Sequence, residues 1–213
     1  MKANLNHQLN DPNLKGVEIL SIGTELLLGN IVNTNAKWIS EELSLLGLNH
    51  FRQSTIGDNS KRISKLVKEI SSRSNLLITT GGLGPTPDDL TTEAIARSFN
   101  ASLFEREYLW DGIKQKLSHS NTNLNNSGLK KQCFFPKNAQ IINNPRGTAP
   151  GMIWKPIKGF TILTFPGVPS EMKEMWKETA FDYILNNFSD GHKFFSNTLE
   201  FSGIGESTIT EKI

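Results

Sequence analysis

The chain has 213 residues, a formal net charge of +2 and a single cysteine, Cys133. This length suits one sizeable domain with part of a second, and it is ample to bury an apolar core without cross-links. The small net charge argues against a general nucleic-acid surface. One cysteine excludes an internal disulfide and a cysteine-based zinc site, which fits a cytoplasmic protein. No run of about 18 apolar residues is present that could span a membrane.

The first half of the chain predicts alternating strands and helices. Residues 1–15 are rich in asparagine, lack the apolar stretch of a secretory signal, and are expected to form a flexible tail. Apolar runs predict strands at 17–23, 50–56 and 76–78, and apolar residues at helical spacing predict helices at 34–46 and 60–70. This βαβαβ order favours parallel strands with right-handed crossovers. The loops that follow the three strands should therefore meet at one edge of the sheet.

The third predicted strand leads into Thr79–Glu93, which reads TTGGLGPTPDDLTTE and precedes a short predicted helix. Glycines leave backbone N–H groups uncovered, and at the carboxyl end of a strand such groups suit a phosphate. Asp88 and Asp89 follow directly. A phosphate-binding loop beside paired carboxylates suggests a bridging metal ion or acid–base catalysis at a phosphate ester. The alternative is a glycine–proline turn in which Asp89 caps the next helix.

The second half of the chain is less regular. Its patterns predict a helix at 105–118, a short strand at 139–142, a hairpin of 152–154 with 160–165, and a helix at 171–188. Beyond residue 189, a strand at 194–201 and a helix opening at 203–207 are expected to begin a second, small α/β domain that is truncated at Ile213.

Six motifs, taken in chain order, resemble the CinA family (competence/damage-inducible protein A). They are GTELLLG at 23–29, NTN at 33–35, the run from Thr79 to Thr92, GTAPG at 147–151, PGVPSEM at 166–172 and GIGES at 203–207. The resemblance implies a three-layer α/β fold with a mostly parallel sheet of the molybdopterin-binding (MoaB/Mog-like) type over residues 16–188. The start of the second domain would then occupy 189–213.

The same resemblance implies an activity. Family members hydrolyse ADP-ribose to AMP and ribose 5-phosphate with the help of metal ions. Many also carry a C-terminal domain that deamidates nicotinamide mononucleotide, and no segment of these 213 residues corresponds to it. The function expected here is therefore metal-dependent hydrolysis of a nucleoside diphosphate sugar.

The motifs nominate candidate site residues. Asp88 and Asp89 are expected to hold a divalent metal ion (Mg, Mn or Co, with K as an additional candidate), and Asp58 is a third candidate catalytic carboxylate. The residues expected to bind phosphate or nucleotide are Gly23, Thr24, Glu25, Gly81, Gly82, Gly84, Thr148, Gly151, Pro166 and Gly167. Asp88 is favoured for chemistry because Asp89 is better placed to cap a helix, and capping is an equal alternative for Asp58. Arg146 is a weaker candidate partner for phosphate.

Two other functions use the same loop and stay open. One is a pterin-binding module, which is either non-catalytic or adenylates molybdopterin. The other is a non-catalytic scaffold for a missing nicotinamide-nucleotide amidohydrolase domain. The expected partners are a small-molecule nucleotide or pterin and a second copy of the chain, with neither nucleic acid nor membrane. The homodimer is expected from the resemblance and from four tryptophans, which are more aromatic surface than a small sheet protein must bury.

Overall fold

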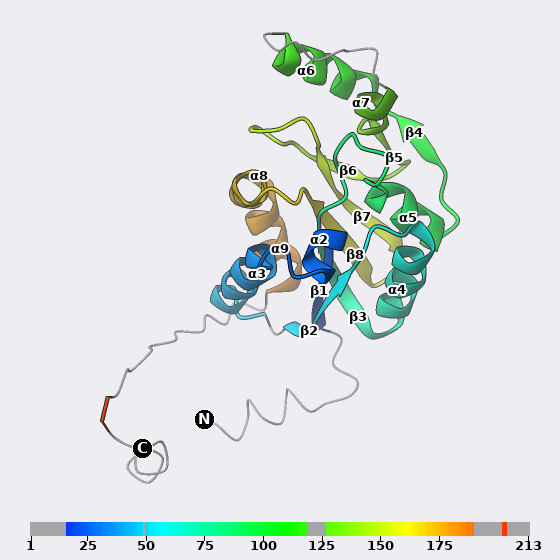
Figure 1. Cartoon of the computed structure of the whole chain (residues 1–213). Coiled ribbons are helices and arrows are strands. Elements are labelled where there is room, and N and C mark those ends of the chain that lie inside the picture. The colour runs from blue at the N-terminus through cyan, green and yellow to red at the C-terminus, as the bar shows by residue number, and fades with distance from the viewer. Residues whose placement is uncertain (1–15, 49, 119–126, 190–201, 204–213) are drawn as a thin grey trace.

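The computed structural model describes residues 16–48, 50–118, 127–189 and 202–203. Its centre is a six-stranded sheet with the order β2-β1-β3-β8-β7-β6 (Figure 1). The strands are β1 (Gly16–Ile22), β2 (His50–Ile56), β3 (Ser74–Thr80), β6 (Gln140–Ile142), β7 (Gly151–Ile157) and β8 (Phe160–Phe165). β2, β1, β3 and β8 pair in parallel, whereas β7 and β6 are antiparallel to their neighbours. The predicted mostly parallel sheet is confirmed.

Helices cover both faces of this sheet (Figure 1). They are α2 (Thr24–Leu27), α3 (Thr34–Leu45), α4 (Ser60–Arg73), α5 (Thr91–Ser98), α6 (Glu107–Leu117), α7 (Ser127–Lys131), α8 (Pro169–Met175), the π-helical turn η1 (Trp176–Ala180) and α9 (Phe181–Phe188). One apolar core joins the sheet to α3 and to the α8-η1-α9 segment, and a second joins it to α4, α5, α6 and α7. β1 serves both cores, because alternate side chains of a strand point to opposite faces: Val17 and Ile19 enter the first core, and Leu20 and Ile22 the second.

All four tryptophans belong to these cores. Trp154 and Trp176 are buried, and Trp38 and Trp110 are partly buried against the same clusters. Trp38 and Trp176 also make an edge-to-face contact with ring centroids 5.6 Å apart. The packing of all four tryptophans against these cores weakens them as an argument for a dimer, and homodimerisation stays a prediction.

Local sequence explains where the helices begin and end. The Asn33 side chain accepts a hydrogen bond from the N–H of Ala36 and caps α3, and Gly47, with φ of 73°, follows its last turn as predicted. Asn59 caps α4 by accepting from the N–H of Arg62. The alternative role of Asp58 as the cap of α4 is therefore wrong.

The structure departs from the sequence expectations in a short additional sheet and at the start of α8. β4 (Leu103–Glu105) and β5 (Phe134–Pro136) form a separate two-stranded sheet that three-residue runs are too short to predict. The last long helix begins at Pro169, earlier than expected, because proline suits the first position of a helix. The expected tail at 1–15 lies outside the described residues. So does the second domain expected at 189–213, apart from Ser189 and 202–203.

Four loops leave the parallel strands at the same edge of the sheet. They are Gly23 with α2 after β1, Gly57–Asn59 after β2, Gly81–Leu90 after β3 and Pro166–Val168 after β8. β1 lies between β2 and β3, so the chain reverses its direction of winding there. In open α/β sheets, the crevice at the carboxyl ends of the strands beside such a reversal is where ligands bind.

Candidate functional site

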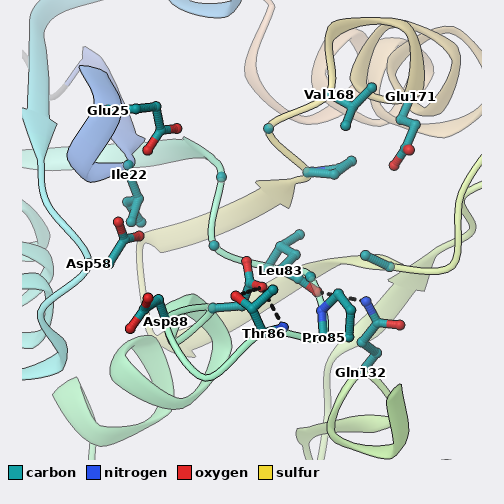
Figure 2. A pocket seen from close by; sticks show the side chains of 18 of the residues that line it. Ile22, Glu25, Asp58, Leu83, Pro85, Thr86, Asp88, Gln132, Val168 and Glu171 are labelled. Atoms are coloured by element: carbon teal, nitrogen blue, oxygen red, sulfur yellow. Dashed lines mark hydrogen bonds between the residues drawn. The ribbon is translucent and has the colours of Figure 1, made fainter. Parts of the chain in front are cut away.

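A cavity of about 770 Å³ opens at this edge of the sheet, and a volume of roughly 300–1,000 Å³ is usual for a small-molecule site (Figure 2). All of the residues nominated from the sequence line it except Gly151 and the weaker candidate Arg146. The nominated residues that line it are Gly23, Thr24, Glu25, Asp58, Gly81, Gly82, Gly84, Asp88, Asp89, Thr148, Pro166 and Gly167. Residues from separate parts of the chain therefore meet in one pocket.

Gly151 lies outside the cavity. It is buried at the start of β7, and a Cβ atom added there would lie 2.0 Å from the backbone oxygen of Thr164. A glycine is needed because two strands approach closely at this point. The structure does not bring Gly151 to the cavity.

Gly81 forms the turn that follows β3. Its φ of 97° suits glycine, and an added Cβ would lie 2.0 Å from the backbone oxygen of Ile22. Its N–H donates to the carbonyl of Phe165 at 2.9 Å, and its carbonyl accepts from Thr91 Oγ1 at 2.8 Å. The expectation that the Gly81 N–H faces a phosphate is therefore wrong, because the sheet already uses that donor.

The N–H groups of the three residues after Gly81 are not used by the sheet. Within the described ranges, the N–H groups of Gly82, Leu83 and Gly84 have no hydrogen-bond acceptor in the protein. All three residues line the cavity, and Leu83 is buried. Gly82 and Gly84 are partly exposed, so donors on this loop can reach a ligand or water in the cavity, and a backbone N–H without a protein acceptor is suited to either.

Two of the three nominated aspartates are fixed by local hydrogen bonds. Asp58 Oδ2 accepts from both the N–H and the hydroxyl of Thr24, each at 2.8 Å, and so joins the loops after β1 and β2. Asp89 Oδ2 accepts from the N–H of Thr86 at 2.8 Å and from its hydroxyl at 2.6 Å. The N-cap position of α5 is Leu90, so the alternative role of Asp89 as a helix cap is wrong.

Asp88 is exposed and makes no hydrogen bond or ion pair with any described residue. Figure 2 shows it on the same side of the pocket as Asp58, although the two come from different loops. Both carboxylate oxygens of Asp88, and one oxygen each of Asp58 and Asp89, are thus available to a ligand.

Among the lining residues that were not nominated from the sequence, Glu171 and Gln132 carry polar side chains with defined contacts. Glu171, in the first turn of α8, accepts a hydrogen bond from Asn144 Nδ2 at 2.7 Å. Gln132 follows α7 and donates from Nε2 to the carbonyl of Leu83 at 3.2 Å, while its Oε1 is buried without a partner among the described residues. Glu171 is part of the PGVPSEM motif, but the sequence predicts for it only a favourable interaction between an acidic side chain in the first turn and the helix dipole. No sequence signal marks Gln132.

Two lysines hold the cavity's loops without lining it. Lys131 Nζ donates to the carbonyls of Thr86 and Asp89, the latter at 2.8 Å, so α7 grips the loop that carries the paired aspartates. Lys116 Nζ donates to the carbonyls of Asn144 and Gly147. Burial lowers the pKa of Lys116, and the charge of nearby Glu171 partly opposes this change. Both ammonium groups therefore donate to backbone carbonyls of the loops.

The charge of the lining is one-sided. Five carboxylates line the cavity, namely Glu25, Asp58, Asp88, Asp89 and Glu171, and no lysine, arginine or histidine among the described residues does. Arg146, the weaker candidate for phosphate, instead pairs with Glu174 at 3.3 Å. The described part of the chain contains no group of three or more histidine, cysteine, aspartate or glutamate side chains arranged to hold a metal ion.

Comparisons with known proteins decide the family. A family model described as "Probable molybdopterin binding domain" matches residues 18–186. A CinA-like protein from Prochlorococcus marinus subsp. pastoris is 85% identical over all 213 residues, which cover 49% of its length. The crystal structure of CinA from Thermoplasma acidophilum superposes with a TM-score of 0.73 at 33% identity, covering 80% of this chain and 98% of that one. The chain belongs to the CinA-like proteins.

Other matches extend this result. A CinA-like protein from a Synechococcus species is 55% identical over 198 residues, covering 93% of this chain and 47% of its own length. The chain thus spans about half the length of the CinA-like relatives. The molybdopterin biosynthesis enzyme MoaB from Thermus thermophilus superposes with a TM-score of 0.50 at 19% identity, covering 81% of this chain and 98% of that one, which shows the shared fold. Among the described residues, no helix is long and apolar enough to cross a membrane.

Proposed function

We propose that this CinA-like chain is a metal-dependent hydrolase of a nucleoside diphosphate sugar, which cleaves ADP-ribose to AMP and ribose 5-phosphate. One observation carries the proposal. The cavity combines the unpartnered N–H groups of Gly82, Leu83 and Gly84 with five carboxylates and no basic side chain of the described residues. The N–H groups call for an anion, and the carboxylates call for a cation that accompanies it.

Electrostatics supports this combination. Two like unit charges about 4 Å apart repel each other by about 4 kcal/mol near a protein surface. A free diphosphate would meet that repulsion from several of the lining carboxylates. A diphosphate that arrives with a divalent cation avoids most of it, which is why the proposed activity depends on metal.

The residues present fit one way of holding such a cation. Asp88 has both carboxylate oxygens free, and Asp58 and Asp89 each have one, although they form no complete protein cage. Mg²⁺ is usually held in this way, by one or two carboxylates together with water and phosphate oxygens of the substrate. When bound, the ion would neutralise charge on the diphosphate and lower the pKa of an attacking water.

The chain's own residues have distinct tasks in this proposal. The N–H groups from Gly82 to Gly84 bind and orient the diphosphate. The Asp89–Thr86 hydrogen bonds and the Lys131 contacts keep the aspartate loop in place. The Asp58–Thr24 contact fixes α2 against the same pocket. Holding the reacting groups in place before the reaction removes part of the entropic cost of bringing them together.

A second candidate is a pterin-binding module. The family model favours it, because that family is described as a probable molybdopterin binding domain. The shared fold with MoaB agrees, since MoaB is described as a molybdopterin biosynthesis enzyme. A pterin phosphate would use the same N–H groups. A scaffold without activity would need neither the free donors nor the free carboxylates. Homodimerisation and a cytoplasmic location remain predictions.

The test is to incubate the full chain with ADP-ribose and Mg²⁺, Mn²⁺ or Co²⁺, with and without K⁺, and to follow AMP by chromatography. AMP release that EDTA abolishes is the expected result. Titration of the same preparation with a molybdopterin precursor tests the second candidate. Pterin binding without AMP release in any of the metals would overturn the hydrolase in favour of the pterin module.

A further inference from the structure

We propose that Glu171 determines specificity in this cavity by accepting hydrogen bonds from the vicinal hydroxyls of a ribose. The inference rests on the proposed function, because it takes the ligand to be a nucleotide or a ribose phosphate. It adds a recognition residue that neither the glycine loop nor the aspartates provide.

The position of Glu171 is the first argument. Figure 2 shows its carboxylate on the side of the pocket away from Asp58 and Asp88, entering from α8. The unpartnered N–H groups of Gly82 to Gly84 lie on the loop between these two sides. A diphosphate held on that loop, next to Asp88, would therefore direct one of its two sugar substituents toward Glu171.

The rigidity of Glu171 is the second argument. Asn144 is 3% exposed, and its Nδ2 donates both to Glu171 Oε2 at 2.7 Å and to the Ala149 carbonyl at 3.0 Å. Its Oδ1 accepts from the N–H of Gly147 at 2.8 Å, which locks the amide. A Cβ added at Gly147 would lie 2.4–2.6 Å from the Glu171 carboxyl group, so the turn passes directly over that carboxylate. The carboxylate is held in place before any ligand arrives.

The charge of Glu171 is the third argument. No ion pair joins it to a described lysine or arginine, because Lys116, which is near enough to interact with its charge, donates to the carbonyls of Asn144 and Gly147. A carboxylate accepts hydrogen bonds and repels phosphate. The ligand group beside it should therefore be a hydrogen-bond donor and not a phosphate oxygen, and the donors next to a nucleotide phosphate are the ribose hydroxyls. A carboxylate on ribose hydroxyls is also how many dinucleotide-binding proteins recognise the sugar.

Glu171 could also have a purely structural role, because an acid in the first turn stabilises a helix and Asn144 ties it to a neighbouring turn. Such a role predicts a lower melting temperature in variants but no change in discrimination between ligands. The experiment therefore measures a ratio of affinities and not an affinity alone.

The test is calorimetric titration of the full chain, with Mg²⁺ present, using two pairs of ligands. ADP and 2′,3′-dideoxy-ADP differ only in the hydroxyls of the adenosine ribose. Ribose 5-phosphate and 2-deoxyribose 5-phosphate differ in a hydroxyl of the other ribose. Wild type should prefer the hydroxylated member of one pair by roughly tenfold or more, which is typical for loss of a hydrogen bond to a charged group. Glu171→Ala should remove that preference.

Glu174→Ala is the matched control, since Glu174 lies on the same helix, pairs with Arg146 and does not line the cavity. It should keep the wild-type preference. If Glu171→Ala does not fold, Glu171→Gln, which can still accept from Asn144, should reduce the preference at an unchanged melting temperature.

Each outcome decides something. Equal preference in wild type and in a folded Glu171 variant would refute the ribose assignment alone, as would absence of any preference in wild type. No binding of any of the four ligands would refute the proposed function and the ribose assignment with it. The pair in which the preference is lost identifies which ribose Glu171 contacts.

Discussion

The ion pair between Glu18 and Arg73 offers a stringent test of the energetics of the sheet. Glu18 lies in β1 with a side chain 3% exposed, whereas the side chain of Arg73, at the end of α4, is 32% exposed. Arg73 donates from Nε and from a terminal nitrogen to the two carboxylate oxygens, at 2.7 and 2.9 Å, and Ser74 Oγ donates at 2.6 Å. These contacts and the charge of Glu18 raise the pKa of Arg73.

The two partners should not be equally costly to remove. Arg73→Met leaves a buried carboxylate without its cation, and breaking a buried pair in this way costs about 3–5 kcal/mol. Glu18→Gln leaves the more exposed partner, whose guanidinium can turn to water, so the loss should be about 1–3 kcal/mol. Replacing the more exposed residue should therefore destabilise the protein more than replacing the buried one.

Urea unfolding of both variants, followed by circular dichroism, measures this difference. A Glu18→Gln variant that is as unstable as Arg73→Met would refute the reasoning.

Three further predictions concern single positions. Asp89→Ala should lower stability by about 1 kcal/mol through the loss of its loop hydrogen bonds, whereas Asp88→Ala should stay within about 0.5 kcal/mol of wild type; equal melting curves for the two would contradict the loop geometry. Gly81→Ala should lower the free energy of unfolding by at least about 2 kcal/mol, because the φ of Gly81 is positive and an added Cβ would clash with backbone. Gly112 lies in open space on α6, so Gly112→Ala should raise the free energy of unfolding by about 0.5–1 kcal/mol. Denaturant midpoints measure both changes, and equal midpoints for the two variants would contradict this reasoning. Burial raises the pKa of the Cys133 thiol to about 11, so about one molecule in a thousand is a thiolate at pH 8 and iodoacetamide should label it only after unfolding; rapid labelling of the folded protein would contradict this.

Much of the fold follows from pattern and topology. The strands of the first half are long apolar runs, and the helices between them carry apolar residues at helical spacing, so both signals are strong. The convergence of Thr24, Asp58 and Gly81 on one pocket follows from parallel strands alone, because their carboxyl ends share an edge. No contact had to be known in advance.

The details of the site depend on contacts that sequence spacing does not reveal. The N–H of Gly81 donates to the carbonyl of Phe165 at the end of β8, which lies 84 positions further along the chain. Asp58 binds Thr24 instead of capping a helix, because Asn59 already has that role. Gln132 reaches the pocket only because α7 packs over the glycine loop. Each of these three contacts is determined by tertiary packing, which overrides the local conformational preference of the residue.

The same limit applies to the short elements. β4 and β5 have three residues each, too few for an alternating pattern, and they pair with each other across α6 and α7. The π-helical turn between α8 and α9 has no sequence signature of its own. Its residues simply continue the apolar stripe of one long predicted helix.

The most direct test of the proposed activity is the rate of AMP release from ADP-ribose by wild type and by Asp88→Asn, in the same divalent metal. Asparagine keeps the size of the side chain and removes its charge, and Asp88 has no hydrogen bond to any described residue, so the variant should melt with wild type. If Asp88 helps to hold the metal, the barrier should rise by about 3 kcal/mol or more, which lowers the rate by roughly a hundredfold or more. A folded Asp88→Asn protein that releases AMP at the wild-type rate, or a wild type that is equally active in EDTA, would contradict a metal-dependent hydrolase centred on this cavity.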